Sequence, residues 1–172
     1  VMVSRFPDNS KLASYCHNDR PVHYTQNLFV AGQLPDPSQP VLIISGGAAD
    51  QPLAQEAELA LKAFGINPLM YEDRGIAHPT RVIDALKEAM PQNPRALIAI
   101  AGMEASLATF VSSLVPLPVI GVPSSVGYGH KASETALYSM LASCTPNLTV
   151  VNTACAMRAA VVASLIAKQA HS

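Results

Sequence analysis

Short apolar runs alternate with longer amphipathic segments from residue 41 to the end of the chain. The first run, 41–45, ends at two glycines and precedes a segment, 51–64, whose apolar residues share one helical face. The same pattern repeats, which predicts strands at 68–71, 95–101, 118–122 and 148–152 and helices at 79–90, 104–114, 134–143 and 156–170. We therefore expect five strands that alternate with five helices.

Successive strand and helix units predict a parallel sheet, because parallel strands need crossover connections that helices commonly provide. We expect a doubly wound, flavodoxin-like α/β fold of three layers. Residues 1–40 differ, since they carry prolines at 7, 21, 35, 37 and 40 and show no sustained period. We expect this segment to form an extended arm that precedes a single α/β domain, 41–172.

The composition favours a subunit of an oligomer. Hydrophobic residues make up 49% of the chain and charged residues only 13%, which suggests that subunits bury surface against one another. The net charge of −1 offers no basic surface for nucleic acid, and no apolar run is long enough to cross a bilayer. Three cysteines without a CxxC pair are typical of reduced thiols. We expect a cytoplasmic homo-oligomer that acts on a small molecule.

Chemically versatile residues follow the predicted strands, which is where parallel sheets bind their ligands. Gly46 and Gly47 suit a close backbone approach to an anion, and Asp50 then serves either as a ligand-binding carboxylate or as a helix N-cap. The loop 123–131 is longer than a strand-to-helix connection needs, and its composition suits a phosphate or a ribose. Its candidate binding residues are Ser124, Ser125, Gly127, Tyr128 and Gly129.

Three other side chains allow either a catalytic or a structural interpretation. His78 follows Asp73 between a strand and a helix, where an imidazole can shuttle a proton or simply face solvent. Glu104 is expected to open a helix, as a stabilising first-turn charge or as an acid/base group. The local pattern alone makes Cys144 a small buried filler. Metal-ligating residue types also occur at 16–23, but without a recognised ligand spacing.

Six motifs resemble, in their order, those of one enzyme superfamily. They are GGAAD, RGIAHPT, AGMEASL, VIGVPSSVGYG, SMLASC and LTVVN, and together they extend over residues 41–170. The set resembles the PurE superfamily and is most similar to LarB, the pyridinium-3,5-biscarboxylic acid mononucleotide synthase family of nickel-pincer cofactor assembly. LarB proteins show AGMEGALPS, VIAVPTSVGYG and a Ser-Cys pair before TVVN, which correspond here to 101–106, 119–129 and 143–152.

The resemblance implies a carboxylase. LarB enzymes carboxylate the pyridinium ring of nicotinic acid adenine dinucleotide with CO2 or bicarbonate and release AMP. By this resemblance Cys144 is the nucleophile whose thiolate adds to the ring, while His78 and Glu104 handle protons. The implied substrate-binding residues are Gly46, Gly47, Asp50, Asp73, Ala101, Gly102, Met103, Asn152 and the loop 124–129. No tightly bound cofactor is expected, LarB relatives use Mg2+, and the superfamily implies a tetramer to octamer.

Two alternatives follow from departures in these motifs. A PurE-type carboxylase or mutase would act on aminoimidazole ribonucleotide through His78. The phosphate-binding serines of the PurE motif GSxSD are missing from the corresponding stretch 46–50, which has alanines at 48 and 49, and Pro79 replaces the PurE arginine. The segment 151–158 reads VNTACAMR where LarB proteins show VNIDNGFG. A nucleotide-binding protein that kept the sheet but lost the chemistry is the third hypothesis, because these substitutions remove polar groups.

Overall fold

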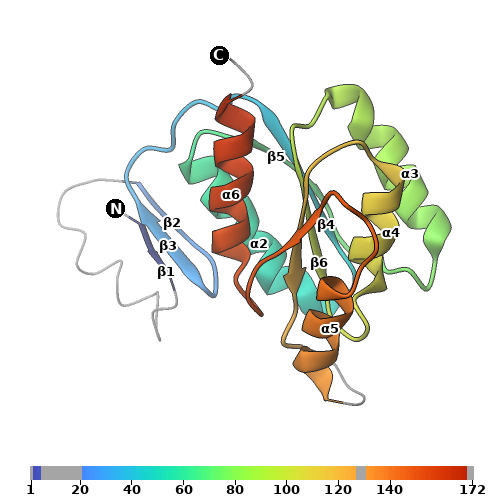
Figure 1. The fold of residues 1–172 in the computed structure, drawn as a ribbon. Helices are drawn as coiled ribbons and strands as arrows, with labels where there is room; N and C mark the ends of the chain where they lie inside the picture. Colours follow the sequence, from blue (N-terminus) through green and yellow to red (C-terminus); the bar gives the residue numbers. More distant parts are fainter. Residues whose placement is uncertain (1, 5–20, 127–130, 170–172) are drawn as a thin grey trace.

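The computed structural model describes residues 2–4, 21–126 and 131–169 and shows a parallel five-stranded sheet between two layers of helices (Figure 1). The strands are β4 (Pro40–Ser45), β5 (Asn67–Tyr71), β6 (Leu97–Ala101), β7 (Val119–Pro123) and β8 (Leu148–Val150). The helices are α2 (Gln51–Ala63), α3 (Pro79–Ala89), α4 (Ser106–Leu114), α5 (Ala132–Leu141) and α6 (Ala156–Gln169), with short 3-10 helices η1 (Ala48–Asp50) and η2 (Met90–Gln92).

The strand order is β5-β4-β6-β7-β8 and every pairing within this sheet is parallel. In chain order this is the 2-1-3-4-5 arrangement of a flavodoxin-like sheet. The predicted fold class is therefore confirmed. Because the direction of winding reverses between β4 and β6, the crevice beyond the carboxyl ends of these two strands is the expected ligand position.

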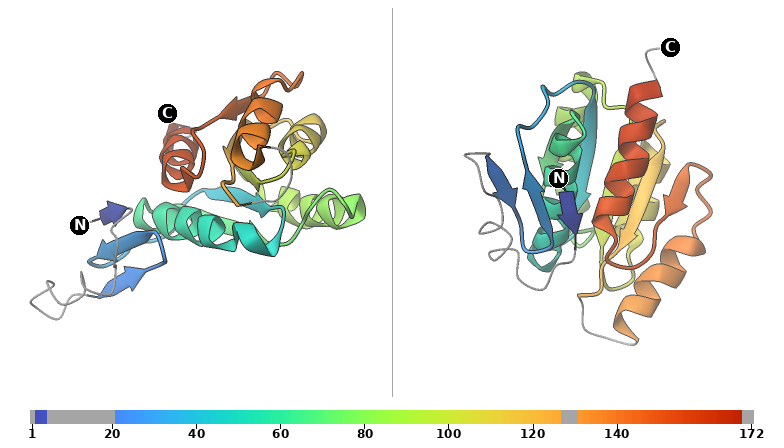
Figure 2. Two further views of the ribbon diagram at one scale, coloured as in Figure 1. Left: turned by 90° about the horizontal axis from the view of Figure 1, so that it is seen from below. Right: turned by 90° about the vertical axis from the view of Figure 1, so that its left-hand side faces the viewer.

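Two apolar clusters explain why the strand sequences are continuously hydrophobic. Figure 2 shows α2 and α6 on one side of the sheet and α3 and α4 on the other. Ile43 and Ile98 point toward α2 and α6, whereas Leu42 and Leu97 point toward the opposite layer, and all four are 0% exposed. A strand that is buried on both faces has no polar face, so its sequence shows an apolar run instead of alternation.

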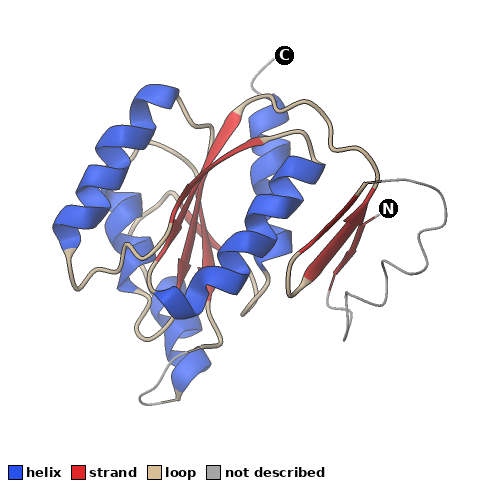
Figure 3. Ribbon diagram, turned by 180° about the vertical axis from the view of Figure 1, so that it is seen from behind, coloured by secondary structure: helices blue, strands red, loops and turns tan. Residues whose placement is uncertain are grey.

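The segment before residue 40 contains a second, smaller sheet, where an extended arm was expected. Strands β1 (Met2–Ser4), β2 (Val22–Tyr24) and β3 (Leu28–Ala31) pair antiparallel in the order β1-β3-β2. Figure 3 shows this sheet beside the main domain. Leu28 is 0% exposed and belongs to the same apolar cluster as α2. Strands of three or four residues are too short to produce a recognisable period, which is why the pattern did not reveal them.

The observed and predicted element bounds differ at the start of α4 in a way that affects a candidate residue. This helix begins at Ser106, so Glu104 lies in the preceding turn and does not open the helix as expected. Ala105 has a φ of 52°, a left-handed conformation that an α-helix cannot contain, and this residue therefore separates Glu104 from the helix. Within the described residues, none of the helices has the length and apolar character needed to cross a membrane.

Candidate active site

A cavity of about 660 Å³ lies beyond the carboxyl ends of β4 and β6, at the position where the sheet changes its direction of winding. Its volume is in the range of ordinary small-molecule sites. The lining comes from the end of β6, the segments that follow β4, β5, β6 and β7, and the first turn of α4. These residues are Gly46, Gly47, Ala48, Ala49, Asp50, Gly75, Ile76, Ala77, Ala101, Gly102, Met103, Glu104, Ala105, Ser106, Leu107 and Val126.

Two glycines allow the loops around this cavity to touch. A Cβ atom at Gly75 would lie 2.8 Å from the carbonyl oxygen of Gly46, and a Cβ atom at Gly102 would lie 2.4 Å from that of Val126. Side chains cannot be accommodated at such distances without a shift of the backbone. The loops after β4 and β5 therefore meet on one side of the cavity, and the loops after β6 and β7 meet on the other.

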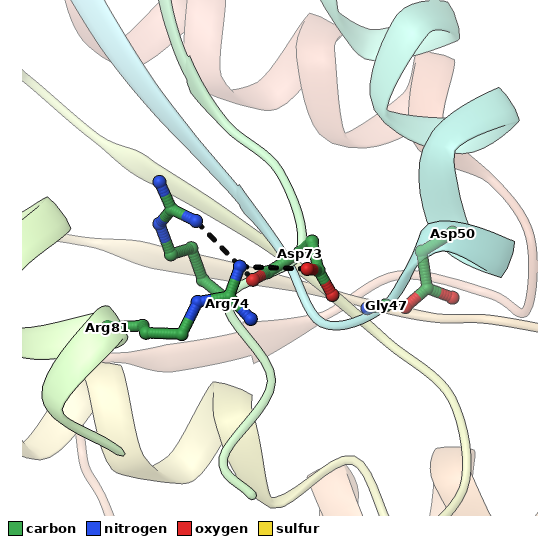
Figure 4. Close-up of polar contacts among 5 residues, drawn as sticks. All are labelled: Gly47, Asp50, Asp73, Arg74 and Arg81. Carbon is green, nitrogen blue, oxygen red and sulfur yellow. Dashed lines mark hydrogen bonds and ion pairs between the residues drawn. The ribbon is translucent and has the colours of Figure 1, made fainter. Parts of the chain in front are cut away.

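Asp50 is the buried carboxylate of the cavity wall, with a relative exposure of 5%. Its Oδ2 accepts a hydrogen bond from the backbone N–H of Gly47 at 3.0 Å, across the loop that follows β4 (Figure 4). Burial raises the pKa of Asp50, while hydrogen bonds from the Gly47 backbone and the Ser124 side chain partly offset that rise. Asp50 also occupies the N-cap position of α2, but its side chain makes no capping hydrogen bond to that helix, so the carboxylate serves the loop after β4 instead of α2.

Ser124 and Ser125 have different environments at the end of β7. Ser124 is only 1% exposed, and its Oγ accepts a hydrogen bond from the backbone N–H of Val126 at 3.2 Å. Its side chain also interacts with Asp50, from the opposite side of β6. Ser124 thus lies beneath the cavity surface, whereas Ser125 is exposed. Gly127, Tyr128 and Gly129, which the sequence also nominated, lie outside the described residues.

The turn after β6 presents Met103 and Glu104 at the mouth of the cavity. Both side chains are exposed, and Glu104 Oε1 accepts a hydrogen bond from the Ser106 hydroxyl at 2.6 Å. Met103 and Ala105 on either side of Glu104 adopt positive φ values of 50° and 52°. Such conformations are unfavourable for residues other than glycine and are typical of binding and catalytic sites. The turn therefore holds Glu104 between two strained residues.

An ion pair joins Asp73, in the segment after β5, to Arg81 in the first turn of α3. Asp73 Oδ2 and Arg81 Nη2 are 2.8 Å apart, and both side chains are well exposed (Figure 4). The hydrogen bond from Arg81, followed by its positive charge, lowers the pKa of Asp73. His78 is exposed at the N-cap position of α3 and makes no side-chain capping bond. Neither Asp73 nor His78 lines the cavity, although the neighbouring Ala77 does.

Cys144 is exposed and lies in the loop between α5 and β8, so it is not the buried filler that its local pattern indicated. It does not line the cavity that contains Asp50 and Glu104. Asn152, after β8, is also exposed and also lies outside the lining, and its Oδ1 accepts the backbone N–H of Thr153 at 2.9 Å. A single chain thus brings seven of the nominated residues into the cavity lining, whereas Cys144 and Asn152, like Asp73 and His78, lie outside it. The seven are Gly46, Gly47, Asp50, Ala101, Gly102, Met103 and Glu104.

The sequence analysis missed several residues of this region. Ile76, Leu107 and Val126 give the cavity apolar walls, and only their closeness to the nominated loops could have indicated them. It also missed Glu56, which is 1% exposed on α2 and whose Oε1 accepts the backbone N–H of Met157 in the first turn of α6 at 3.1 Å. The one sequence signal for Glu56 is a carboxylate among the apolar positions of its helix.

The described residues do not offer a preformed metal site. No group of three or more histidine, cysteine, aspartate or glutamate side chains in 2–4, 21–126 and 131–169 is arranged to hold a metal ion. Most of the 16–23 segment, with its metal-ligating residue types, lies outside these ranges. Mg2+ often binds through substrate phosphates with only one or two protein carboxylates, so a requirement for Mg2+ stays a prediction.

A small-molecule cavity at the switch point of a flavodoxin-like sheet defines an α/β protein of the ligand-binding or enzymatic kind. Comparison with known families identifies it further. The AIR carboxylase family matches residues 40–172, and the chain belongs to this family. The superfamily predicted from the motifs is thereby confirmed.

The curated relatives include an uncharacterized protein and several N5-carboxyaminoimidazole ribonucleotide mutases. The chain is 41% identical to the uncharacterized protein MJ0165 of Methanocaldococcus jannaschii over 129 aligned residues. The aligned region covers 75% of this chain and 50% of that protein. The chain is 42% identical to the N5-carboxyaminoimidazole ribonucleotide mutase of Saccharolobus solfataricus over 86 aligned residues. This aligned region covers 48% of the chain and 52% of the mutase. The chain thus spans about half the length of the curated relatives it matches.

Solved structures of the same superfamily have a similar fold. A crystal structure of a variant of Treponema denticola PurE2 superposes with a TM-score of 0.65 at 27% identity, and covers 78% of this chain and 83% of that chain. The PurE structure from the same organism superposes with a TM-score of 0.62 at 26% identity, with the same coverage. An enzyme of carboxylase or mutase type is therefore the functional class that these relatives support.

Proposed function

We propose that the chain is a LarB-like carboxylase that adds CO2 or bicarbonate to the pyridinium ring of nicotinic acid adenine dinucleotide and cleaves its phosphoanhydride. In this proposal the Cys144 thiolate adds to the cationic ring and makes it electron-rich enough to attack CO2. A base then removes the proton from the carboxylated ring carbon, and expulsion of the thiolate restores the aromatic ring. Asp50 and the neighbouring glycine loop bind the substrate, and Glu104 and His78 handle protons. The ordered motifs that resemble LarB are the basis of this assignment.

The charge of the cavity is the structural observation that carries the proposal. The described lining contains two carboxylates, Asp50 and Glu104, and no lysine, arginine or histidine. The stretch 46–50 reads GGAAD and lacks the phosphate-binding serines of the corresponding GSxSD motif of PurE enzymes. A phosphate, whether of a ribonucleotide or of the dinucleotide itself, would gain no cationic partner from this lining, whereas a cationic pyridinium ring would lie beside two carboxyl groups. The cavity is thus better suited to the ring than to a phosphate.

The position of Cys144 adds a requirement to this proposal. Because the thiol lies outside the cavity of its own chain, it must reach the ring either from a second copy of the chain or after movement of its loop. We favour the second copy, since the chain is rich in hydrophobic residues and exposes Tyr138 and Leu141 at 61% and 60% on the helix that precedes Cys144. The proposed enzyme is then a homo-oligomer whose sites are shared between subunits.

The direct test is incubation of the protein with nicotinic acid adenine dinucleotide, bicarbonate and Mg2+, with products followed by mass spectrometry. The proposal predicts a product with added carboxyl mass and release of AMP in the wild type, and neither in Cys144→Ala. Cys155→Ala is the matched control, because it removes a cysteine that is half-buried near the start of α6. Full activity of Cys144→Ala would refute the role of this thiol.

The second candidate is a PurE-type activity on an aminoimidazole ribonucleotide. The observation that favours it is the similarity to three N5-carboxyaminoimidazole ribonucleotide mutases, at 39% to 42% identity over 84 to 86 residues. This activity should depend on His78 and should survive the loss of Cys144. Conversion of N5-carboxyaminoimidazole ribonucleotide by Cys144→Ala but not by His78→Asn would establish it in place of the first proposal.

The third hypothesis is a nucleotide-binding protein without catalysis. Its motivation is the loss of polar residues at Ala48, Ala49 and Ala154 relative to the related motifs. Calorimetric binding of nicotinic acid adenine dinucleotide without turnover of either substrate would favour this hypothesis. Turnover of either substrate would exclude it.

A further inference from the structure

Four hydroxyl side chains connect α4 to the loop that carries Cys144. Thr109 Oγ1 donates to Ser143 Oγ at 3.0 Å, and Ser112 Oγ donates to the backbone carbonyl of Thr109 at 3.0 Å. Thr145 Oγ1 lies 2.8 Å from Ser143 Oγ and 2.7 Å from Ser112 Oγ. Ser112 is 4% exposed, so the group is partly shielded from water. We call these four residues, Thr109, Ser112, Ser143 and Thr145, the hydroxyl ring.

Proton counting fixes the direction of every bond in the hydroxyl ring. A hydroxyl group can donate only one hydrogen bond. Because Ser112 already donates to the Thr109 carbonyl, Thr145 must donate to Ser112. Ser143 must then donate to Thr145, and Thr109 donates to Ser143. The bonds form one continuous chain that begins and ends on Thr109, in which every side-chain donor is used.

The hydroxyl ring fixes the chain on both sides of Cys144. Ser143 and Thr145 both turn toward α4, whereas the Cys144 side chain between them is exposed. The backbone N–H of Thr145 also approaches Ser143 Oγ at 3.4 Å across Cys144. The loop is thereby anchored to a helix that packs on β6 and whose first residue lines the cavity. Breaking one link leaves the next hydroxyl without its partner, so the four bonds depend on one another.

We infer that the hydroxyl ring is a positioning device that holds the Cys144 thiol in one outward orientation for nucleophilic attack. This inference rests on the proposed function, in which Cys144 is the nucleophile. None of the four residues of the hydroxyl ring lines the cavity that contains Asp50 and Glu104. They act through the geometry of the loop, and misplacement of a nucleophile by about 1 Å can lower a rate on the order of 100-fold.

Thr145→Val is the sharpest perturbation, because valine has nearly the shape of threonine but can neither donate to Ser112 nor accept from Ser143. Thr145→Ser restores the hydroxyl and is the rescue variant. Ser113→Ala is the matched control on the same helix, since its hydroxyl donates to the Phe110 carbonyl at 2.7 Å and lies outside the hydroxyl ring. If Thr145→Val fails to fold by circular dichroism, Ser143→Ala breaks the same chain at the neighbouring link.

Two readouts on the full chain separate positioning from mere structural support. The first is carboxylation of nicotinic acid adenine dinucleotide, for which we expect kcat of Thr145→Val to fall at least about 10-fold while KM changes less than about twofold. The second is the rate of Cys144 alkylation by iodoacetamide, resolved from the other thiols by peptide mass spectrometry. We expect this rate to fall about threefold in Thr145→Val, because the released loop no longer holds the thiol in its exposed, outward orientation. Thr145→Ser and Ser113→Ala should resemble the wild type in both.

The outcomes distinguish this inference from the proposed function. An active wild type together with a fully active Thr145→Val would overturn the inference and leave the proposed function intact. An inactive wild type would refute the proposed function, and alkylation would then decide the inference alone. In that case a slower Cys144 reaction in Thr145→Val, restored in Thr145→Ser, supports positioning of the thiol, and equal rates in all variants overturn it.

Discussion

Replacement of Gly102 by alanine tests whether the loops after β6 and β7 must touch to form the cavity. The added Cβ atom would lie 2.4 Å from the Val126 carbonyl oxygen, whereas ordinary contacts of this kind begin at 3.4 Å. The backbone at Val126 would have to move by the difference, about 1 Å. Overpacking of this kind costs about 1–3 kcal/mol of folding free energy. The obstacle is backbone, so no side-chain rotation can relieve it.

Gly47→Ala is the matched control for this prediction. Gly47 lines the same cavity, but a Cβ atom there meets no atom within 4 Å, and its φ of −134° is accessible to any residue. We therefore expect its free energy of unfolding to stay within about 0.5 kcal/mol of the wild type. Urea unfolding of the three proteins measures both values. A Gly102→Ala protein as stable as Gly47→Ala would refute the contact between the two loops.

Three further predictions concern residues around the site. Burial raises the pKa of Asp50, so ionisation of this carboxyl group opposes folding. The contribution of Asp50 to the free energy of unfolding is therefore most favourable below its pKa in the unfolded chain, and it declines as pH rises through its pKa in the folded protein. The stability of Asp50→Asn relative to the wild type should therefore increase as pH rises above the ordinary pKa of an aspartate, measured by urea unfolding at several pH values, and a difference that does not change with pH would contradict this. Glu56→Ala should lose about 1–3 kcal/mol in the same assay, because a buried N–H of α6 loses its acceptor, and Glu56→Gln should lose less. Ala154 has a φ of 52°, so Ala154→Gly should raise the free energy of unfolding by about 0.5–1 kcal/mol. Ala160→Gly, in the middle of α6, should instead lower it by about 1 kcal/mol or more. Thermal unfolding measures both variants, and shifts of both melting temperatures in the same direction would argue against strain at Ala154.

The sequence pattern determined the repeating architecture of the domain. Each predicted strand from 41 onward corresponds to an observed one, and the helices agree to within a few residues at their ends. This success has a physical cause, since burial on both faces leaves an apolar run and burial on one face leaves a helical period. It also explains why loops after the strands were good candidates, because parallel strands place their carboxyl ends along one edge.

Tertiary structure alone decided which of these candidates meet. Asp50 and Glu104 line one cavity because β4 and β6 are neighbours in the sheet, although β5 lies between them in the chain. Cys144 stands apart from that cavity, since its loop is bonded to the side of α4. The hydrophobic pattern of a helix or strand predicts which of its faces is buried, but not which other element packs against that face. The meeting of distant loops depends on strand order and helix packing, and those are properties of the whole fold.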